Sequence, residues 1–542
     1  MKNLLLSFMC ALLLSACADN REDDRGADIQ GDKKSTSNSG SMLIAAPVEC
    51  NVSGYTNTQW LSPDPVKQLG AVPVNGKPML PSNKVPGTSE NCDFHMFSWQ
   101  WFLYLMNPDP ASSGQDLRNF ENNLLFPVVD LDTCTSVASG KTGLRKKYGL
   151  TPSVLKVVNM PDIPGQAGSG AALYDKNTNL VFYNRSFTKN ECGIYASGNF
   201  PVASGSNKNF PTQVNQVVEL KSSWRIMGEN DDMTKYYLIE ANIEGLGKQQ
   251  LGMVGFHVVV NTGAHPEFVW ATFEHIDNAP DCQVVIPSNG FTRKQPANGW
   301  SFASKSCNTC IAANFKNGAD LKSQCQTQCD FNKNQTKPVY DSQGNVMIHG
   351  GAGQTSSNIC LDAYYGEAPV PQNASNVPNI QFLNTLLVGP KGMITQLKDT
   401  HPMAVFKNYY LGGAEWTDVS KIKSPSTPFN TEIAGSAYLA NATMESFTQA
   451  GADPFFEKGC FSCHGGASGQ NTAMASHLLT SAPGKAPGLI ERCDVKAGPI
   501  FDNAQAQQVC PGTCKNAMGW NHNWKRITDQ MAVCGCNACP TP

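Results

Sequence analysis

Hydrophobic and polar positions along the chain predict one buried helix and a group of strands. Residues 92–106 (CDFHMFSWQWFLYLM) are mostly apolar or aromatic and are followed by Asn-Pro, which predicts a buried helix that ends at the proline. Between residues 214 and 277, four partly alternating runs are rich in Val, Ile, Tyr and Phe: NQVVELKSSWRIM, KYYLIEANI, LGMVGFHVVVN and EFVWATFEHID. Charged or Gly-containing turns separate them, so they predict an antiparallel sheet. With helices also expected at residues 379–387 and 442–450, the predicted fold class is α+β.

Composition favours a globular protein. The chain has 542 residues, of which 41% are hydrophobic and 16% charged, and this is enough apolar material for a large core. The 41 Lys and Arg residues nearly balance the 44 Asp and Glu residues, so the formal charge is -3. This balance offers no broad basic surface to a nucleic-acid backbone, and nucleic acid is not an expected partner. After residue 16, no apolar run approaches the roughly 20 residues that span a bilayer.

The N-terminus has the layout of an export signal, because one Lys precedes a short apolar stretch that ends in small residues. The sequence LSAC resembles the lipobox of bacterial lipoproteins, which implies a lipoprotein signal peptide at residues 1–16 and a diacylated Cys17. Ala18 follows instead of Asp, and in Gram-negative lipoproteins this favours the outer membrane. The alternative is an ordinary signal peptide with an incidental Cys. Polar residues 17–47 predict a flexible tether ahead of a main domain at residues 48–485.

Twenty cysteines in an exported chain indicate an oxidising compartment, where thiols pair by default. Setting aside Cys10 in the signal, the lipid site and the two cysteines of CFSCH leaves sixteen, enough for eight disulfides of open connectivity. Four of them lie in CNTC at residues 307–310 and CQTQC at residues 325–329, within a segment rich in Asn, Gln, Lys and Ser. These four predict two disulfides, with a zinc site as the alternative.

The strongest chemical signal is CFSCH at residues 460–464. In the C-x-x-C-H pattern, two thiols separated by two residues reach the two vinyl groups of one porphyrin, and the adjacent His lies under the iron. The sequence therefore predicts one covalent haem c, with thioethers at Cys460 and Cys463 and with His464 as the proximal ligand. The alternatives are a disulfide beside an incidental His and half of a zinc site.

The sixth iron ligand stays open, because a different module begins too soon after the motif for a complete small cytochrome domain to fit. The candidates near the motif are Met474 and His477, and those in the upstream domain are Met444, His275 and Met403. Each Met has core packing as its alternative role. An iron with no sixth side chain would bind a small ligand or peroxide, whereas a closed iron mainly transfers electrons.

Several blocks resemble a family of uncharacterised bacterial proteins with a cytochrome c domain. The resemblance rests on FHMFSWQWFLYLMNP at 94–108, VELKSSWR at 218–225, LGMVGFHVV at 251–259, VWATFEHIDNAPDC at 269–282 and LANATMESFTQ at 439–449, ahead of CFSCH. It implies that the haem motif belongs to the C-terminal end of one large domain and not to a detachable cytochrome module. The expected architecture is a large mixed antiparallel-sheet domain with C-terminal helices that carry the haem motif.

The block FEHIDN gathers Glu274, His275, Asp277 and Asn278 at the end of the last predicted strand. His and carboxylates suit proton transfer, so one interpretation is a haem ligand or an acid/base group near the iron. The other is a strand end held by hydrogen bonds. His95, within the predicted helix, is expected to be a core His.

From Ala497 the chain reads AGPIFDNAQAQQVCPGTCKNAMGWNHNWKRITDQMAVCGCNAC. This segment is similar to one repeat of the cyanobacterial oligomannose-binding lectin family, whose pattern runs from AGP, an aromatic residue, Asn and AQ to a helix, a Trp-containing strand and a final strand. The resemblance implies a small α+β lectin-like module at residues 497–539. It also implies four cysteines that staple the module: Cys510, Cys514, Cys534 and Cys536.

The same resemblance places five residues at the family's sugar-binding positions: Phe501, Asp502, Asn503, Asn523 and Trp524. Two of these positions depart from the family pattern. The family's first Trp is Phe501 here, and its Gly-Gln-Trp is His522-Asn523-Trp524. Phe keeps a stacking face but lacks the indole donor, so the alternatives are a different glycan and a structural cap that no longer binds sugar.

These features predict a lipid-anchored monohaem c-type cytochrome that transfers electrons to or from a redox partner protein and whose terminal module binds a glycan such as surface polysaccharide. The expected location is the outer membrane, on its periplasmic or surface face. One alternative is a haem oxidase or peroxidase that acts on the glycan. Another is a glycan-binding adhesin in which the haem is structural.

Overall fold

The fold is seen in a computed structural model and is α+β. The structure describes residues 50, 91–109, 117–122, 126, 172–188, 191, 217–243, 247–261, 268–286, 290–333, 355–362, 376–417, 433–436, 438–447, 449, 459–460, 493–501, 503–515, 520–528 and 531–536. Within these residues, no helix has both the length and the apolar character that crossing a bilayer requires.

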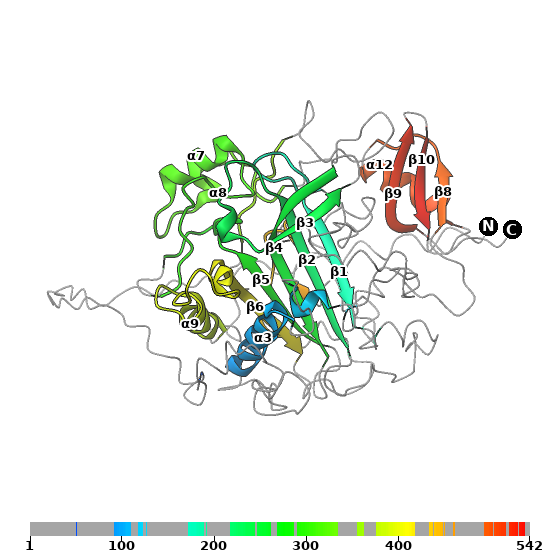
Figure 1. Cartoon of the computed structure of the whole chain (residues 1–542). Helices are drawn as coiled ribbons and strands as arrows, with labels where there is room; N and C mark the ends of the chain where they lie inside the picture. Colours follow the sequence, from blue (N-terminus) through cyan, green and yellow to red (C-terminus); the bar gives the residue numbers. More distant parts are fainter. Residues whose placement is uncertain are drawn as a thin grey trace, which may run out of the picture. The chain divides into compact units, whose positions relative to one another are not determined.

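A seven-stranded antiparallel sheet forms the centre of the main domain (Figure 1). The strand order is β1-β2-β4-β5-β6-β7, and β3 pairs with β4 beside this path. The four predicted runs are confirmed as β2 (Val218–Ile226), β3 (Leu238–Ile243), β4 (Gly247–Val260) and β5 (Val269–His275). The sequence did not predict the three outer strands, which are β1 (Phe182–Phe187), β6 (Tyr409–Thr417) and β7 (Ile433–Gly435).

Two helices pack on one face of this sheet, α3 (Asn91–Met106) and α9 (Asn376–Val388), and both were predicted (Figure 1). The aromatic residues of α3 make the contacts. Phe102 stacks on Phe273 of β5 with 4.2 Å between ring centroids, and Phe94 stacks on Trp416 of β6 at 3.9 Å. Because nearly every residue of α3 is buried, this helix is covered on all sides and is not amphipathic, although it carries a few buried polar residues such as His95 and Gln100.

The other face of the sheet is polar. Side chains alternate along a strand, so Thr272 and Glu274 of β5 point away from Phe273 and the helices. Residues 441–447 lie over this face: Asn441 donates from Nδ2 to Thr272 Oγ1 at 2.8 Å, and the backbone N–H of Ala442 donates to Glu274 Oε1 at 3.0 Å. The two faces of one sheet therefore have opposite chemistry.

The helix expected at residues 442–450 is wrong where the structure describes it, because residues 442–447 form a series of turns. The backbone N–H of Thr443 donates to Asn441 Oδ1 at 2.9 Å, and that of Ala442 bonds to the sheet. Side chains such as Asn and Thr compete in this way with helical backbone bonds. The apolar spacing of the segment thus reflects contact with the sheet and not a helix.

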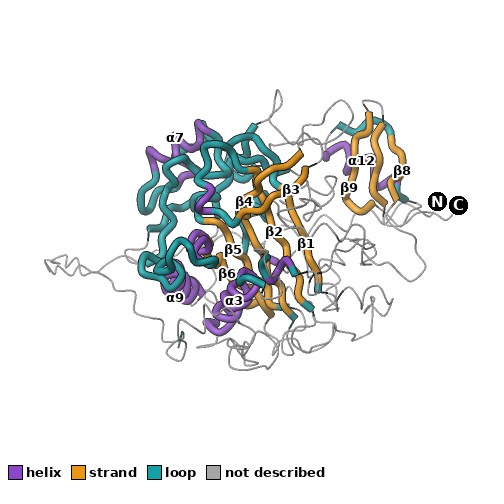
Figure 2. The backbone as a smooth tube through the Cα atoms, in the orientation of Figure 1, coloured by secondary structure: helices purple, strands orange, loops and turns teal. Residues whose placement is uncertain are grey.

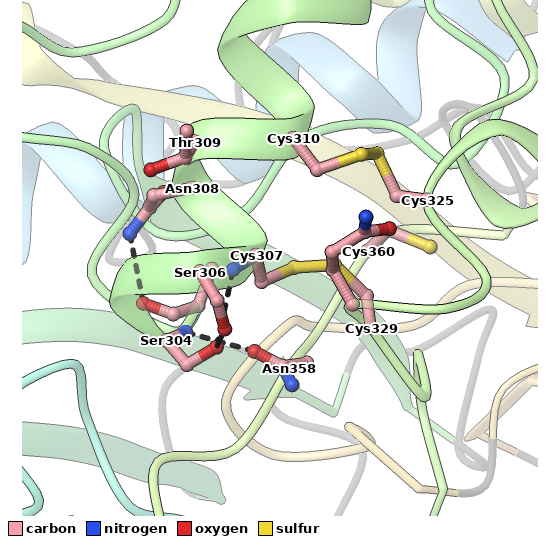
Figure 3. The surroundings of a disulfide bond; sticks show 12 residues. Ser304, Ser306, Cys307, Asn308, Thr309, Cys310, Cys325, Cys329, Asn358 and Cys360 are labelled. Atoms are coloured by element: carbon pink, nitrogen blue, oxygen red, sulfur yellow. Dashed lines mark hydrogen bonds between the residues drawn. A yellow bond between two sulfur atoms is a disulfide. The ribbon is translucent and has the colours of Figure 1, made fainter.

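A disulfide-rich segment runs from Cys282 to Asp362 and contains the helices α7 (Lys305–Asn314) and α8 (Leu321–Gln324). Its described residues are mostly loop (Figure 2) and are held by the pairs Cys282–Cys360, Cys307–Cys329 and Cys310–Cys325. The last two lie close together between α7 and the loop that follows α8 (Figure 3), as the sequence predicted. Zinc is excluded as the role of these four cysteines, because disulfide sulfurs are not thiolates. The same holds for Cys282 and Cys360, which lie near the Asp362 carboxylate.

The C-terminal module has the order β8 (Cys493–Ala497), α12 (Asn503–Thr513), β9 (Trp520–Thr528) and β10 (Met531–Cys536). Its antiparallel sheet has the order β8-β10-β9. Disulfides join Cys510 to Cys534 and Cys514 to Cys536, so the four expected stapling cysteines do pair with one another. Positions i and i+4 of a helix share one face, as do i and i+2 of a strand, and this allows both bonds. The first strand begins ahead of the expected boundary at residue 497.

Six disulfides are described, the sixth being Cys50–Cys92 at the start of α3. The disulfide-rich interpretation of the composition is therefore correct. Cys134, Cys192, Cys539 and the side chain of Cys493, which would complete eight pairs, lie outside the described residues, as do the signal peptide, Cys17 and the tether.

Candidate functional site

The described part of the CFSCH segment contacts the polar side of the sheet. The backbone N–H of Cys460 donates to Glu415 Oε2 at 2.7 Å, and the Glu415 side chain is fully buried. Glu415 lies on β6 opposite Trp270 of β5, so both project from the same face as Thr272 and Glu274. Cys463 and His464 lie outside the described residues.

Further polar residues project from this face, which we call the polar face and define by Lys221, Ser223, His257, Thr272, Glu274 and Glu415. Cross-strand register brings them together, because Lys221 of β2 pairs with His257 of β4, and His257 pairs with Thr272 of β5. All six are buried or nearly so. Since a buried polar group is costly unless it has a partner, such a face indicates a site or a dense network of contacts.

A close contact joins the polar face to residues 441–447, which cover it. His257 Nε2 lies 3.4 Å from Glu445 Oε2, and the same oxygen accepts the backbone N–H of Asn441 at 2.9 Å. Burial acts to raise the pKa of Glu445, but His257 and Lys221 outweigh it and hold that pKa below its ordinary value. Glu445 is therefore an anion at neutral pH and His257 faces it directly.

Glu274 is the second carboxyl of this region and behaves in the opposite way. Burial raises its pKa to about 7, and the nearby Arg293 only partly offsets this effect. Its Oε1 accepts the Ala442 N–H, and its Oε2 accepts from Asn278 Nδ2 at 3.4 Å. A buried carboxyl with a pKa near neutral can hold or release a proton there, which is the property an acid/base group needs.

His275, a candidate iron ligand, lies on the opposite side of the sheet. Its Nε2 donates to the backbone oxygen of Lys235 at 3.1 Å, and its Nδ1 accepts the backbone N–H of Asp277 at 3.1 Å. The ring stacks on Tyr236 with 3.9 Å between centroids, and burial lowers the pKa of His275 to about 4. Because both ring nitrogens already have partners, these contacts support the structural interpretation of this residue.

The rest of the FEHIDN block also ties down the end of β5. Asp277 pairs with Lys235 Nζ at 3.0 Å, and Asn278 donates from Nδ2 to the backbone oxygen of Val254 at 2.6 Å. Of the block, only Glu274 is on the polar face. Because side chains alternate along a strand, Glu274 and His275 lie on opposite faces of the sheet although they are adjacent in sequence.

The two upstream methionine candidates differ in location. Met403 is fully buried and precedes the 3-10 helix Ala404–Asn408, whose Phe406 packs edge-on against Phe102 of α3, on the helix side of the sheet. Met444 is also buried but belongs to the segment that covers the polar face, between Thr443 and Glu445. Met474 and His477 lie outside the described residues.

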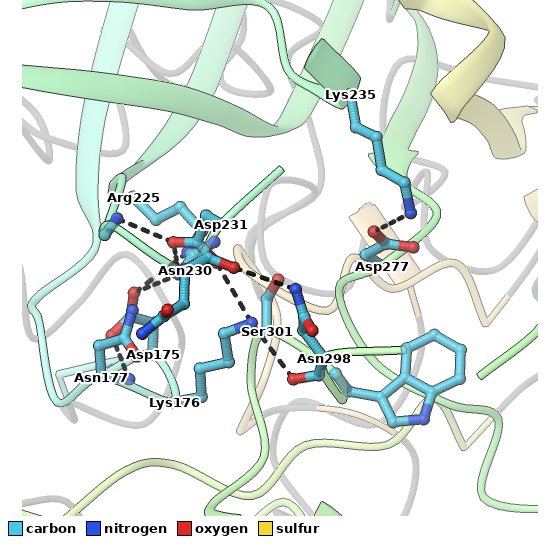
Figure 4. A network of polar contacts seen from close by, with 12 residues as sticks. Asp175, Lys176, Asn177, Arg225, Asn230, Asp231, Lys235, Asp277, Asn298 and Ser301 are labelled. Carbon is cyan, nitrogen blue, oxygen red and sulfur yellow. Dashed lines mark hydrogen bonds and ion pairs between the residues drawn. The ribbon is translucent and has the colours of Figure 1, made fainter. Parts of the chain in front are cut away.

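A charged cluster that the sequence did not reveal lies at the end of β2 (Figure 4). The fully buried Arg225 donates from Nε to Asp175 Oδ2 at 3.1 Å and from Nη2 to Asp231 Oδ2 at 2.8 Å. Lys176 Nζ lies 3.2 Å from Asp231 Oδ1. The residues of this cluster are far apart in sequence, so no local motif predicts it. Its ion pairs connect β2 to two loops, which indicates a structural role.

In the C-terminal module, the expected sugar-binding residues are only partly described. Phe501 is 49% exposed, and its backbone N–H donates to Gln505 Oε1 at 2.8 Å. Trp524 is half-buried and packs with Trp520 against the disulfide core of the module. The side chains of Asp502, Asn503 and Asn523 lie outside the described residues. Trp524 therefore has at least a packing role, whereas Phe501 presents a ring to solvent.

Comparison with known proteins gives no assignment: no family model, no curated protein and no solved structure matches the chain. The function therefore has to be argued from the residues themselves.

Proposed function

We propose that this protein is a lipid-anchored monohaem c-type cytochrome that transfers electrons and that carries a carbohydrate-binding module at its C-terminus. The observation that carries the proposal is the pentapeptide CFSCH, whose first cysteine is held against the main sheet by Glu415. A motif fixed in this way belongs to the main domain, where burial can tune a redox group. At the N-terminal end, the proposal includes a diacylated Cys17 that anchors the protein to the outer membrane through a flexible tether.

The donor set fits haem c. Two thiols and one imidazole within five residues are the groups that the cofactor needs, and Cys460, Cys463 and His464 would hold it. When bound, haem supplies one-electron oxidation and reduction at its iron. The main domain contributes a fixed attachment point at β6. In the segment that covers the polar face it also contributes Glu445, whose pKa is held below its ordinary value.

Mass spectrometry of the mature full-length protein tests this function directly. We expect the peptide that contains residues 460–464 to carry one haem, and a Cys460→Ser, Cys463→Ser double variant to carry none. The same experiment on the N-terminal peptide should find acyl chains on Cys17. A peptide of unmodified mass at residues 460–464 in the purified protein would refute the cytochrome proposal.

A haem oxidase or peroxidase is the second candidate, and one observation favours it. Glu274, whose pKa is about 7, lies on the same sheet face as the anchor of Cys460, so an acid/base group is available on that side. The reduced spectrum with and without carbon monoxide separates the candidates. Unchanged bands mean a closed iron and electron transfer, whereas a carbon monoxide complex favours the enzyme.

The proposed carbohydrate binding depends on the terminal module. The exposed Phe501 supplies an apolar face of the kind that stacks on a pyranose ring. A glycan array with the full-length protein tests it, with Phe501→Ala as the variant expected to lose retention. Trp524→Ala is the second variant, and because Trp524 packs on the module core, its fold must be checked by circular dichroism. Equal retention by Phe501→Ala and the wild type would contradict the assigned site, and no retention of any glycan would contradict binding itself.

A further inference from the structure

We propose that Glu415 is a positioning residue of the haem site: its buried side chain holds the backbone at the first haem cysteine and places a negative charge beside the cofactor. The inference rests on the proposed cytochrome function. It starts from the 2.7 Å bond that the Cys460 N–H donates to Glu415 Oε2, which joins the described part of the motif to the sheet.

The strand that carries Glu415 is held from both sides. β5 flanks it through the pair Trp270–Glu415, and β7 flanks it through the pair Gly435–Glu415. The next residue, Trp416, points to the helix side and stacks on Phe94 with an interplanar angle of 3°. A carboxylate on such a backbone has little freedom to move, so whatever it binds takes a defined position.

The edge strand β7 has its own support. Gly435 adopts a φ of +81°, and a Cβ there would lie 2.4 Å from both the Ala414 carbonyl and the Trp416 ring, so this close approach requires glycine. Asn376 of α9 donates from Nδ2 to the Gly435 oxygen at 3.0 Å, while its Oδ1 lies 2.9 Å from His95 Nε2 of α3. Both helices thus help to fix the strand next to Glu415.

The hydrogen bond between the Cys460 N–H and Glu415 would fix the backbone at the point where the haem attaches. Cys460 lies 45 residues beyond Glu415, and its amide is the backbone group of the first thioether residue. A hydrogen bond from N–H to a carboxylate is stronger than one between neutral groups. Fixing this amide fixes where the porphyrin edge attaches to the domain. In its ionised form, the Glu415 carboxylate would also favour the more positive ferric state and so lower the reduction potential.

The sheet offers a matched control. Glu219 on β2 is also fully buried, and it lies in the same cross-strand row, since Glu219 pairs with Val259, Val259 with Trp270, and Trp270 with Glu415. Three strand spacings separate the two carboxyls, a distance of roughly 14 Å. Replacing either residue removes one buried carboxyl from the same face, and Glu415 is the one whose carboxyl accepts the Cys460 N–H.

The experiment measures haem content, the reduced spectrum and the midpoint potential of the full-length holoprotein. Glu415→Gln keeps an oxygen for the Cys460 amide, so we expect an unchanged spectrum and a raised potential. Glu415→Ala removes the bond as well, so we expect a raised potential and a shifted or broadened spectrum. Glu219→Gln should shift the potential less than Glu415→Gln does. Near-ultraviolet circular dichroism of each variant verifies the fold, and the near-isosteric Gln variant serves if the Ala variant fails to fold.

The outcomes separate this inference from the function it rests on. A wild-type chain without haem refutes the cytochrome. If the wild type carries haem and both Glu415 variants match its spectrum and potential, the positioning role alone is refuted. Equal shifts in Glu415→Gln and Glu219→Gln would also refute it, because they would show a general effect of buried charge. A larger shift in Glu415→Gln, with spectral change only in Glu415→Ala, supports it.

Discussion

The hydroxyl of Ser223 on β2 lies 2.6 Å from the hydroxyl of Thr443, although 220 residues separate them in sequence. The contact passes over Gly255 of β4, where a Cβ would lie 2.6 Å from both hydroxyl oxygens. Tyr183 of β1 adds a hydrogen bond of 2.6 Å to the Thr443 carbonyl. The segment that precedes CFSCH is therefore held to the polar face by hydroxyl groups around a glycine.

We expect Gly255→Ala to destabilise the main domain by about 1–3 kcal/mol, because the added methyl group must push the covering segment off the sheet. Urea unfolding followed by Trp fluorescence measures the loss. Gly228→Ala is the control, since its new methyl group would lie 3.0 Å from the end of the exposed Asn177 side chain and at an ordinary 3.5 Å from Asp231 Oδ2. If the two variants unfold at the same urea concentration, the close contact at Gly255 does not contribute to stability.

Glu274 should make the protein less stable as the pH rises. Burial raises its folded-state pKa to about 7, above its ordinary value of 4.5, so the folded state binds more protons between these values. Its contribution is present below pH 4.5 and is lost as the pH rises through 7, by an amount on the order of 3 kcal/mol. Glu274→Gln cannot titrate and should lack this decline in unfolding free energy between pH 5 and pH 8. Glu240→Gln, in a surface pair with Lys248, should keep it.

His95 and His275 should make the protein less stable in acid. Burial lowers the pKa of each to about 4 from 6.5, so the unfolded state binds more protons over this range. Stability is complete above pH 6.5 and falls toward pH 4, by on the order of 3 kcal/mol for each ring. Unfolding free energies should be compared in the Glu274→Gln background, which removes the opposing titration. Adding His95→Gln or His275→Gln should flatten the profile, and an unaltered slope in both would disprove this origin.

The cluster around Arg225 should be sensitive to the loss of one partner. Arg225→Met leaves Asp175 buried without its cation, which is expected to cost about 3–5 kcal/mol. Lys248→Met removes a surface pair of similar length, 2.8 Å to Glu240, and should cost less than about 1 kcal/mol. Thermal unfolding of the two variants gives the comparison. A small effect at Arg225 would mean that Asp175 finds another partner or becomes protonated.

Local sequence patterns predicted the elements whose residue types reflect their burial. The helix Asn91–Met106 is mostly apolar or aromatic and ends before a proline, and β2 to β5 are rich in β-branched and aromatic residues, so both were found from the sequence. The strand Tyr409–Thr417 was missed, since GGAEWT carries two glycines and a buried charge. The turns at residues 442–447 were mistaken for a helix, because their bonds to Glu274 and Ser223 are not visible in a local pattern.

The sequence by itself determined the chemistry that is local in the chain. CFSCH spans five residues, the stretch that predicts an export signal is continuous, and the cysteine content predicts disulfides, so each of these patterns can be read along the chain. Only the tertiary structure decided what depends on distance in space. It separated Glu274 from His275 onto opposite faces, paired Cys307 with Cys329 and Cys310 with Cys325, and brought Glu415 to the amide of Cys460. Burial and cross-strand register produce these relationships, and neither is a property of a short stretch of residues.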